Sequence, residues 1–252
     1  MHPPLLKVTG LKKNYGAILA VDGVSFEVMP GEIFGVIGPN GSGKTTMFNS
    51  VLGQIAPSAG RIELNGRDIT GLSPLELSRR GVGRTFQTLQ VFGKMSVRDN
   101  LLVAAQEHHG SMFSRMFAPS DSGLGPKADA LLAQFGLSSV ADRRAGMLTY
   151  GQQKLVDIAM AFMSEPALVL LDEPCAGVDT DLVDEISGLL KKLNAQGTPD
   201  KPRSFIVIEH NMDFIMNLCH RVLVMNEGTV MALGTPQEVR QDRRVLDAYL
   251  GN

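Results

Sequence analysis

The feature that most constrains this chain is a glycine-rich stretch, GPNGSGKTT, which begins at Gly38. It contains the phosphate-binding P-loop pattern, in which four residues separate the first glycine from a Gly-Lys-Thr triplet that begins at Gly43. The apolar segment 33–37 leads directly into the loop, and the helix-compatible segment 46–52 follows it. A chance glycine-rich turn would lack this strand–loop–helix setting. The sequence therefore predicts an α/β fold in which a strand delivers a phosphate-binding loop to the start of a helix.

Each residue type in this loop has a physical role. Glycines let the backbone curl so that successive N–H groups point at one anion. Lys44 places a positive charge on the β- and γ-phosphates, and the Thr45 hydroxyl can ligate Mg²⁺. A helix that starts near Gly43 also directs its positive dipole end at the anion. We expect ATP contacts from Gly38, Pro39, Asn40, Gly41, Ser42, Gly43, Lys44, Thr45 and Thr46.

Length and charge exclude several other classes of protein. A chain of 252 residues suffices for one large domain or one domain with a subdomain. The 24 Lys and Arg residues nearly balance the 26 Asp and Glu residues, so we expect no nucleic-acid partner. Cys175 and Cys219 form no metal or disulfide motif, as in a reduced compartment. We see no signal-peptide pattern, and no apolar run reaches the ~18–20 residues that span a membrane.

Apolar patterns divide the chain into regions of different character. Alternation before the P-loop, in 24–28, and after it, in 61–64, predicts half-buried strands of a β subdomain. The runs 167–171 and 205–208 contain almost no polar residue, which suits parallel strands covered on both faces. These two groups of strands predict a mostly parallel central sheet beside an antiparallel N-terminal subdomain.

Residues 88–150 differ from the rest and predict an α-helical subdomain. Apolar spacing supports helices at 97–105 and 127–135. The stretch 110–126 between them is rich in Ser, Gly, Pro and Met, which predicts a flexible insert. A docking element is the alternative interpretation of this stretch.

Two acidic residues follow the apolar run 168–171. Asp172 stands where P-loop proteins place a second contact to Mg²⁺. Glu173 comes next, and a carboxylate beside the metal can orient and deprotonate an attacking water. Two solvent-facing acids at a strand end are the alternative. Two carboxylates and a proline directly after apolar residues favour a catalytic site.

A second anion-binding helix start is predicted at the segment LTYGQ, residues 148–152. Thr149 is suited to cap the amphipathic helix that follows. Here the chain resembles the ATP-binding cassette (ABC) ATPases, whose signature is usually LSGGQ. Thr149 and Tyr150 depart from that signature, whereas Gly151 and Gln152 retain it.

The resemblance implies roles for further residues, which match the family in sequence order. Tyr15 would stack on adenine, although a core tyrosine is the alternative. Gln87 would contact the Mg²⁺ site, Asp179 would belong to the D-loop, and His210 would contact the γ-phosphate. The implied catalytic residues are Glu173, His210 and Gln87; the metal ligands are Thr45, Gln87 and Asp172; and the further nucleotide contacts are Tyr15, Thr149, Tyr150, Gly151, Gln152 and Asp179.

A finer resemblance points to one group within the family. The phrases RTFQ at 84–87, YGQQ at 150–153, IEHNMDFIM at 208–216 and DAYLG at 247–251 resemble ATP-binding subunits of bacterial branched-chain amino acid importers. Asp179 departs from that group, which often has Asn there. Urea and amide importers share much of the pattern. A soluble cassette ATPase of cofactor assembly is the alternative from another class, and a GTPase or small-molecule kinase is a third.

The resemblance implies a single ATP-binding domain over 1–252, with its core and β subdomain formed by 1–87 and 151–252. One P-loop and one signature per chain mean that two composite sites need a second ATP-binding subunit, identical or related. The other implied partners are membrane-spanning permease subunits and, indirectly, a periplasmic solute-binding protein. The implied location is peripheral, at the cytoplasmic face of the inner membrane.

Overall fold

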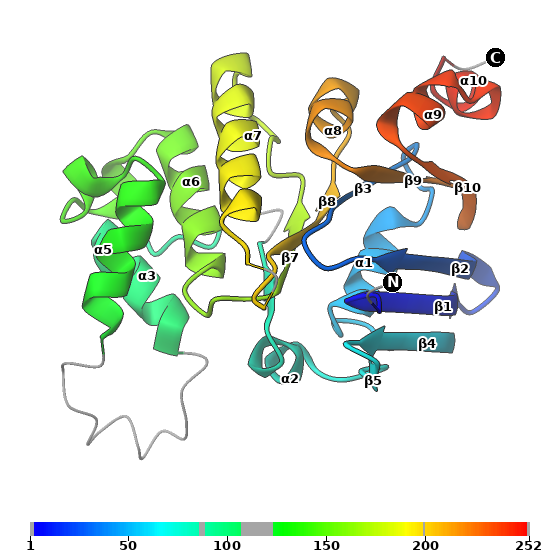
Figure 1. The fold of residues 1–252 in the computed structure, drawn as a ribbon, viewed down its shortest axis with the longest axis horizontal. Coiled ribbons are helices and arrows are strands. Elements are labelled where there is room, and N and C mark those ends of the chain that lie inside the picture. Colours follow the sequence, from blue (N-terminus) through cyan, green and yellow to red (C-terminus); the bar gives the residue numbers. More distant parts are fainter. Residues whose placement is uncertain (1–2, 86–88, 107–122, 199, 251–252) are drawn as a thin grey trace.

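A computed structural model describes residues 3–85, 89–106, 123–198 and 200–250, and it contains two sheets (Figure 1). The smaller sheet is antiparallel, in the order β2-β1-β4-β5. Its strands are β1 (Leu6–Tyr15), β2 (Ile18–Val28), β4 (Ala59–Leu64) and β5 (Arg67–Asp68). This sheet confirms the predicted antiparallel β subdomain.

The larger sheet has the order β10-β9-β3-β8-β7-β6, and its described strands pair in parallel except for the β9–β10 hairpin. Its strands are β3 (Ile33–Ile37), β6 (Val82–Arg84), β7 (Leu168–Asp172), β8 (Ser204–Ile208), β9 (Arg221–Asn226) and β10 (Thr229–Gly234). Parallel neighbours end at the same sheet edge, so the loops after β3, β7 and β8 meet there. The fold is therefore the predicted α/β class, with a mostly parallel central sheet.

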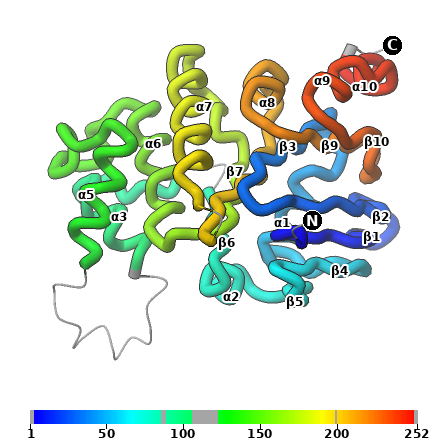
Figure 2. Tube along the Cα trace, viewed as in Figure 1, coloured from blue at the N-terminus to red at the C-terminus, as the bar shows by residue number. Residues whose placement is uncertain are grey.

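Helices cover the central sheet and build a separate lobe (Figures 1 and 2). In the described chain they are α1 (Lys44–Val51), α2 (Pro74–Arg79), α3 (Val97–Gln106), α5 (Leu124–Gln134), α6 (Tyr150–Ala161), α7 (Thr180–Ala195), α8 (Met212–Leu218), α9 (Pro236–Gln241) and α10 (Arg243–Leu250). Figure 2 shows α3, α5 and α6 side by side at one end of the molecule, and α3 contacts both α5 and α6. Helices α3 and α5 lie within the predicted helical subdomain, whereas α6 begins at its C-terminal boundary.

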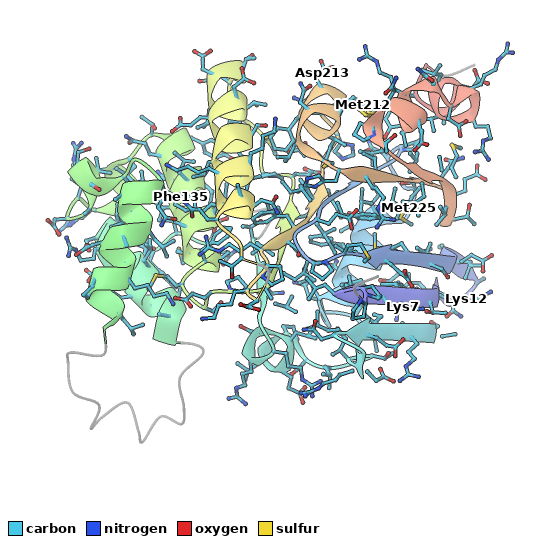
Figure 3. The ribbon with its side chains drawn as sticks, viewed as in Figure 1. Lys7, Lys12, Phe135, Met212, Asp213 and Met225 are labelled. Atoms are coloured by element: carbon cyan, nitrogen blue, oxygen red, sulfur yellow. The ribbon has the colours of Figure 1, made fainter. Side chains whose placement is uncertain are left out.

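The central sheet separates two hydrophobic cores because alternate residues of each strand face opposite sides. In β3, Ile33 and Ile37 join the helical core, whereas Phe34 and Val36 join the core beneath α1 and the antiparallel sheet. Figure 3 places Phe135 among the helices and Met225 toward the antiparallel sheet. The P-loop strand is thus held by packing on both faces.

The helical subdomain is joined to the central sheet through aromatic side chains. The ring centroids of Phe135 and Phe162 are 6.0 Å apart, and those of Phe162 and Phe205 are 5.9 Å apart. All three side chains are buried. The helices and the sheet therefore share one core.

The insert predicted at 110–126 is shorter than expected at its C-terminal end. Helix α5 begins at Leu124, so Pro126 lies in its first turn. A helix tolerates proline there because the first N–H groups have no partner within the helix. The prediction was wrong for 124–126, and residues 107–122 lie outside the described residues.

Two short helices were missed although the sequence carries their start signals. Helices α2 and α9 each begin with a capping box, formed by Ser73 with Glu76 and by Thr235 with Glu238. Each also has a proline in its first turn. A Ser or Thr followed three residues later by Glu is a recognisable start of a helix.

Candidate functional site

The P-loop leaves β3 at Gly38 and enters α1 at Lys44. Gly43 has φ 93°, and a Cβ atom built on it would lie 2.3 Å from the carbonyl oxygen of Ala20. Only glycine fits a left-handed backbone this close to another chain segment. No side-chain hydrogen bond caps the start of α1. Its first N–H groups therefore lack a side-chain partner and remain available for an anion.

Hydrogen bonds to the backbone hold the Lys44 side chain inside the loop. Its Nζ donates to the carbonyl oxygens of Gly38 at 2.7 Å and Pro39 at 2.9 Å. Burial lowers the pKa of Lys44, while the charges of Glu173 and Asp172 act in the opposite direction. The ammonium group is thus held in the loop, where the charges of the two carboxylates at the end of β7 act on it.

The predicted acids and the predicted histidine come together at the ends of adjacent strands. Asp172 pairs in register with Ile208 across β7 and β8. The Oε1 atom of Glu173 lies 2.9 Å from Nε2 of His210. Burial, followed by the charge of Glu173, raises the pKa of Asp172. A cation at this edge would relieve the repulsion between the two carboxylates.

Glu173 has an unusual backbone conformation. Its φ is 47°, in the left-handed region, which costs a non-glycine residue of order 1–3 kcal/mol. Its N–H donates to the carbonyl of Ile208 at 2.9 Å, so the turn after β7 is tied to the end of β8. Such conformations persist where surrounding contacts fix them, and they cluster at functional sites.

The signature segment forms the predicted helix start at α6. Thr149 and Gln152 make a reciprocal capping box, with both hydrogen bonds at 3.3 Å. Tyr150 is exposed, and its hydroxyl donates to the carbonyl of Ala176 at 3.3 Å. Figure 1 shows α6 well apart from α1. One chain therefore does not bring its own signature to its own P-loop.

Asp179 has a structural role within the chain that the sequence did not indicate. Its side chain accepts a hydrogen bond from the N–H of Leu182 at 2.9 Å and caps α7. The predicted nucleotide contact from Asp179 stays a prediction. A Cβ atom on Gly151 would lie 2.4 Å from the Leu182 side chain, so the signature packs against the start of α7.

Tyr15 is not a core residue, because half of its surface is exposed at the end of β1. Nζ of Lys13 lies 5.2 Å from the centroid of its ring. An exposed ring beside a cation is free to stack on a base. Thr45 is also exposed, at the start of α1. Gln87 lies outside the described residues, so its predicted roles are not located.

The oxygen donors near the P-loop fit Mg²⁺. In the described part of the chain, no group of three or more His, Cys, Asp or Glu side chains could hold a metal alone. The Thr45 hydroxyl and the Asp172 carboxylate are hard oxygen ligands of the kind Mg²⁺ prefers. Mg²⁺ in such sites takes one or two protein ligands and completes its shell with phosphate oxygens and water.

Three residues near this site were not predicted. Lys154 and Glu209 are buried and contact the segment after β7. Tyr249 of α10 lies beside the P-loop; burial raises its pKa to about 12, and the backbone of Gly38 acts in the opposite direction. A lysine within the buried stripe of an amphipathic helix was an available signal for Lys154. Nothing local marked the other two.

The fold and the site define a P-loop nucleotide-binding protein of the ATP-binding-cassette class. The family model described as "ABC transporter" matches residues 21–176, and "Branched-chain amino acid ATP-binding cassette transporter" matches 229–252. The chain belongs to the ABC transporter family of ATP-binding cassettes and is an ATPase of that family.

Among curated proteins, the chain is 37% identical to the high-affinity branched-chain amino acid transport ATP-binding protein BraF of Pseudomonas aeruginosa, covering 100% of this chain and 99% of the relative. It is 38% identical to LivG of Escherichia coli K12, a protein described in the same words, again over 100% and 99%. A lipopolysaccharide export system ATP-binding protein, LptB of Acidithiobacillus ferridurans, is 35% identical over 98% and 97%.

Among solved structures, the chain is similar to the ADP conformation of MJ1267, an ATP-binding cassette of an ABC transporter. The TM-score is 0.88 at 35% identity, with 100% of both chains covered. A nucleotide-free cassette from an ABC transporter gives a TM-score of 0.87 at 34% identity, covering 99% and 100%.

Proposed function

We propose that this protein hydrolyses ATP to drive a bacterial importer of branched-chain amino acids. The observation that carries the proposal is the similarity to BraF and LivG over the whole chain, together with the family-specific match at 229–252. The P-loop, Asp172, Glu173 and His210 supply the hydrolytic machinery. Nothing in the cassette needs to contact the transported solute.

In the proposed mechanism the chain binds ATP, orients the attacking water and accepts a proton from it. Lys44 and the N–H groups at the start of α1 bind the β- and γ-phosphates, and Tyr15 stacks on adenine. Thr45, Asp172 and Gln87 would hold a Mg²⁺ ion, which would supply positive charge to neutralise the phosphates. Glu173 orients the attacking water and accepts its proton. His210, 2.9 Å from Glu173, fixes that carboxylate and reaches the γ-phosphate.

We propose that two ATP-binding chains, identical or related, close head to tail around two nucleotides. The separation of α6 from α1 supports this, because a signature that cannot reach its own P-loop is available to a second chain. Each ATP would then lie between Lys44 of one chain and Gly151 of the other. Closure would transmit force to the membrane-spanning permease subunits, which receive solute from a periplasmic solute-binding protein.

The proposed location is the cytoplasmic face of the inner membrane. Within the residues that the structure describes, no helix is long and apolar enough to cross a membrane. Attachment would therefore depend on the permease.

A cavity of about 420 Å³ between α2, α3 and α6 is lined by Leu75 and Phe92, which are half exposed. We assign permease contact to this surface, and Phe92→Asp should reduce co-purification with the permease.

The solute is tested by uptake. Deletion of the gene should abolish high-affinity uptake of labelled leucine, isoleucine and valine and leave urea uptake unchanged. Complementation with the wild-type chain should restore uptake, and the Glu173→Gln variant should not. Loss of urea uptake instead would favour the urea and amide importers. Co-purification with a soluble scaffold and no membrane protein would favour a cofactor-assembly ATPase.

The export protein LptB makes a second candidate worth testing. Its 35% identity nearly equals that of the importer relatives, so the shared cassette alone does not set the cargo. The match at 229–252 favours import. Normal amino acid uptake with defective lipopolysaccharide export in the deletion strain would reverse the choice.

A further inference from the structure

Two buried charges beside the catalytic segment have no part in binding nucleotide as described above. Lys154 on α6 is 0% exposed, and Glu209 at the end of β8 is 4% exposed. A buried charge is costly unless it is paired and hydrogen-bonded. The partners of these two side chains therefore indicate what they do.

Both side chains bind the backbone of the same short segment. Nζ of Lys154 donates to the carbonyl oxygen of Glu173 at 3.2 Å. The Oε1 atom of Glu209 accepts the N–H of Cys175 at 2.7 Å. A cation thus holds a carbonyl, and an anion holds an N–H two residues further on. Charge-assisted hydrogen bonds of this kind are stronger than neutral ones.

Glu209 also ties this segment to the histidine. Its Oε2 atom accepts the N–H of His210 at 3.0 Å and that of Asn211 at 3.4 Å. One carboxylate therefore joins the backbone after β7 to the backbone after β8. The side chains of Glu173 and His210, 2.9 Å apart, project from those two segments.

We propose that Lys154 and Glu209 are positioning residues that clamp segment 173–175 and hold the Glu173 carboxylate against His210 for hydrolysis. The clamp accounts for the left-handed backbone of Glu173, with φ 47°, which surrounding contacts must fix. Lys154 lies two residues after Gln152 on the signature helix. The position of Glu173 is therefore tied to the helix that faces the second chain.

The proposal rests on the proposed ATPase function and is tested by a double-mutant cycle. Lys154→Met and Glu209→Gln are each made alone and combined with Glu173→Gln. Alone, each should lower kcat by about tenfold or more and change the ATP dissociation constant by less than about twofold. Combined with Glu173→Gln, each should lower the residual rate by less than about twofold, because the group on which they act is already lost.

The matched controls are Lys192→Met and Glu185→Gln on the exposed face of α7, which should leave kcat unchanged. Equal losses with and without Glu173, or wild-type kcat in both variants, would overturn the clamp. Lys154→Arg, which keeps a charged donor, should recover more activity than Lys154→Met. If Lys154→Met does not fold, the nearly isosteric Glu209→Gln decides the proposal through the same cycle.

A spectroscopic test needs no hydrolysis. The chain has five histidines, so a histidine-labelled sample gives a simple NMR spectrum. The His210 signal, assigned by its loss in His210→Asn, should move in Lys154→Met and Glu209→Gln in the direction seen for Glu173→Gln. An unmoved His210 signal would overturn the proposal. A wild-type chain that fails to hydrolyse Mg-ATP with its partners would instead refute the proposed function.

Discussion

Helices α1 and α6 both begin at a segment that we propose to bind nucleotide, yet their starts are built differently. The start of α1 follows a glycine with φ 93° and has no side-chain cap. The start of α6 is closed by the capping box of Thr149 and Gln152. Lys44 adds a buried cation to the first start. The second has no lysine or arginine in its first turn.

This difference suggests separate roles for the two helix starts: the α1 start binds the nucleotide, and the α6 start completes the site around it. The α1 start offers uncapped N–H groups and an ammonium group, so it should bind phosphate as a single chain. The α6 start is already stabilised by its own side chains and should bind phosphate weakly alone. Its contribution should appear only when another surface presents the nucleotide.

Removal of Lys44 tests whether the α1 start binds phosphate, and it should have the largest effect. Lys44→Ala removes the P-loop charge that we propose contacts the β- and γ-phosphates. ATP affinity should fall by about 100-fold or more, since charge-assisted hydrogen bonds are lost, and hydrolysis should stop. Nucleotide binding by calorimetry measures this, with Lys192→Ala as the exposed control. Full ATPase activity in the variant would remove the P-loop from the mechanism.

Glu173→Gln separates ATP hydrolysis from ATP binding at the α1 and α6 starts. Hydrolysis should fall by about two orders of magnitude or more, because a positioned general base contributes ~10²–10⁴-fold. ATP should still bind, since Lys44 and Asp172 are kept. With chemistry blocked, an ATP-dependent dimer should appear by light scattering, in the presence of the partner subunit if the enzyme is heteromeric. Near-normal hydrolysis would place the base elsewhere.

Gly151→Asp tests whether the α6 start contributes to the nucleotide site of a second chain. A carboxylate at the α6 start opposes the approach of phosphate, and like-charge contacts cost several kcal/mol, so hydrolysis should fall by roughly 100-fold. ATP binding by the monomer should be unchanged. Gly151→Ala is the steric control, because any Cβ atom here meets the Leu182 side chain. Equal losses in the two variants would mean that packing against Leu182, and not charge, causes the defect.

Helix α6 also carries a buried carboxylate that α1 lacks. Asp157 is 4% exposed, and its Oδ2 has no hydrogen-bond partner among the described residues. Burial raises the pKa of Asp157 to about 6, against a hydrogen bond from Gln90 and the charge of Lys154. Because the pKa of Asp157 is higher in the folded state, the folded protein binds this proton more tightly than the unfolded chain does. This contribution to the free energy of unfolding is fully present below the unfolded-state pKa and is lost as pH rises through about 6.

Asp157→Asn should therefore stabilise the protein at pH 7.5 by about 2–3 kcal/mol, from a shift of about two pKa units at 1.36 kcal/mol each. The difference from wild type should shrink as pH falls toward 4. Urea unfolding at several pH values measures it. Asp184→Asn on the exposed face of α7 should change stability by less than about 0.5 kcal/mol. A pH-independent difference would contradict the burial argument.

Tyr15→Ala should have the smallest effect. Loss of one aromatic surface should weaken ATP binding by about 1–2 kcal/mol. Because Tyr15 is half exposed, the thermal unfolding temperature should hardly change. Unchanged ATP affinity would show that the exposed ring serves another purpose. Tyr15→Phe should retain wild-type affinity.

Local sequence predicted the elements whose signals are local. The P-loop strand and helix, the buried strands β7 and β8, and the cap at Thr149 follow from hydrophobic patterns and residue chemistry. Strand β1 extends to Tyr15, well beyond the apolar residues at its start, because its second half pairs with β2. Pairing across a sheet depends on the partner strand, which local pattern does not reveal.

The sequence by itself determined the class of fold, the phosphate-binding loop and the identity of the acids at the end of β7. Only the tertiary structure decided that Lys154 and Glu209 form hydrogen bonds with the backbone at Glu173 and Cys175, and that Asp179 caps α7. A motif fixes which groups are adjacent along the chain. Contacts between residues far apart in sequence depend on how parallel strands and packed helices bring their ends together, and that is decided by packing of the whole chain.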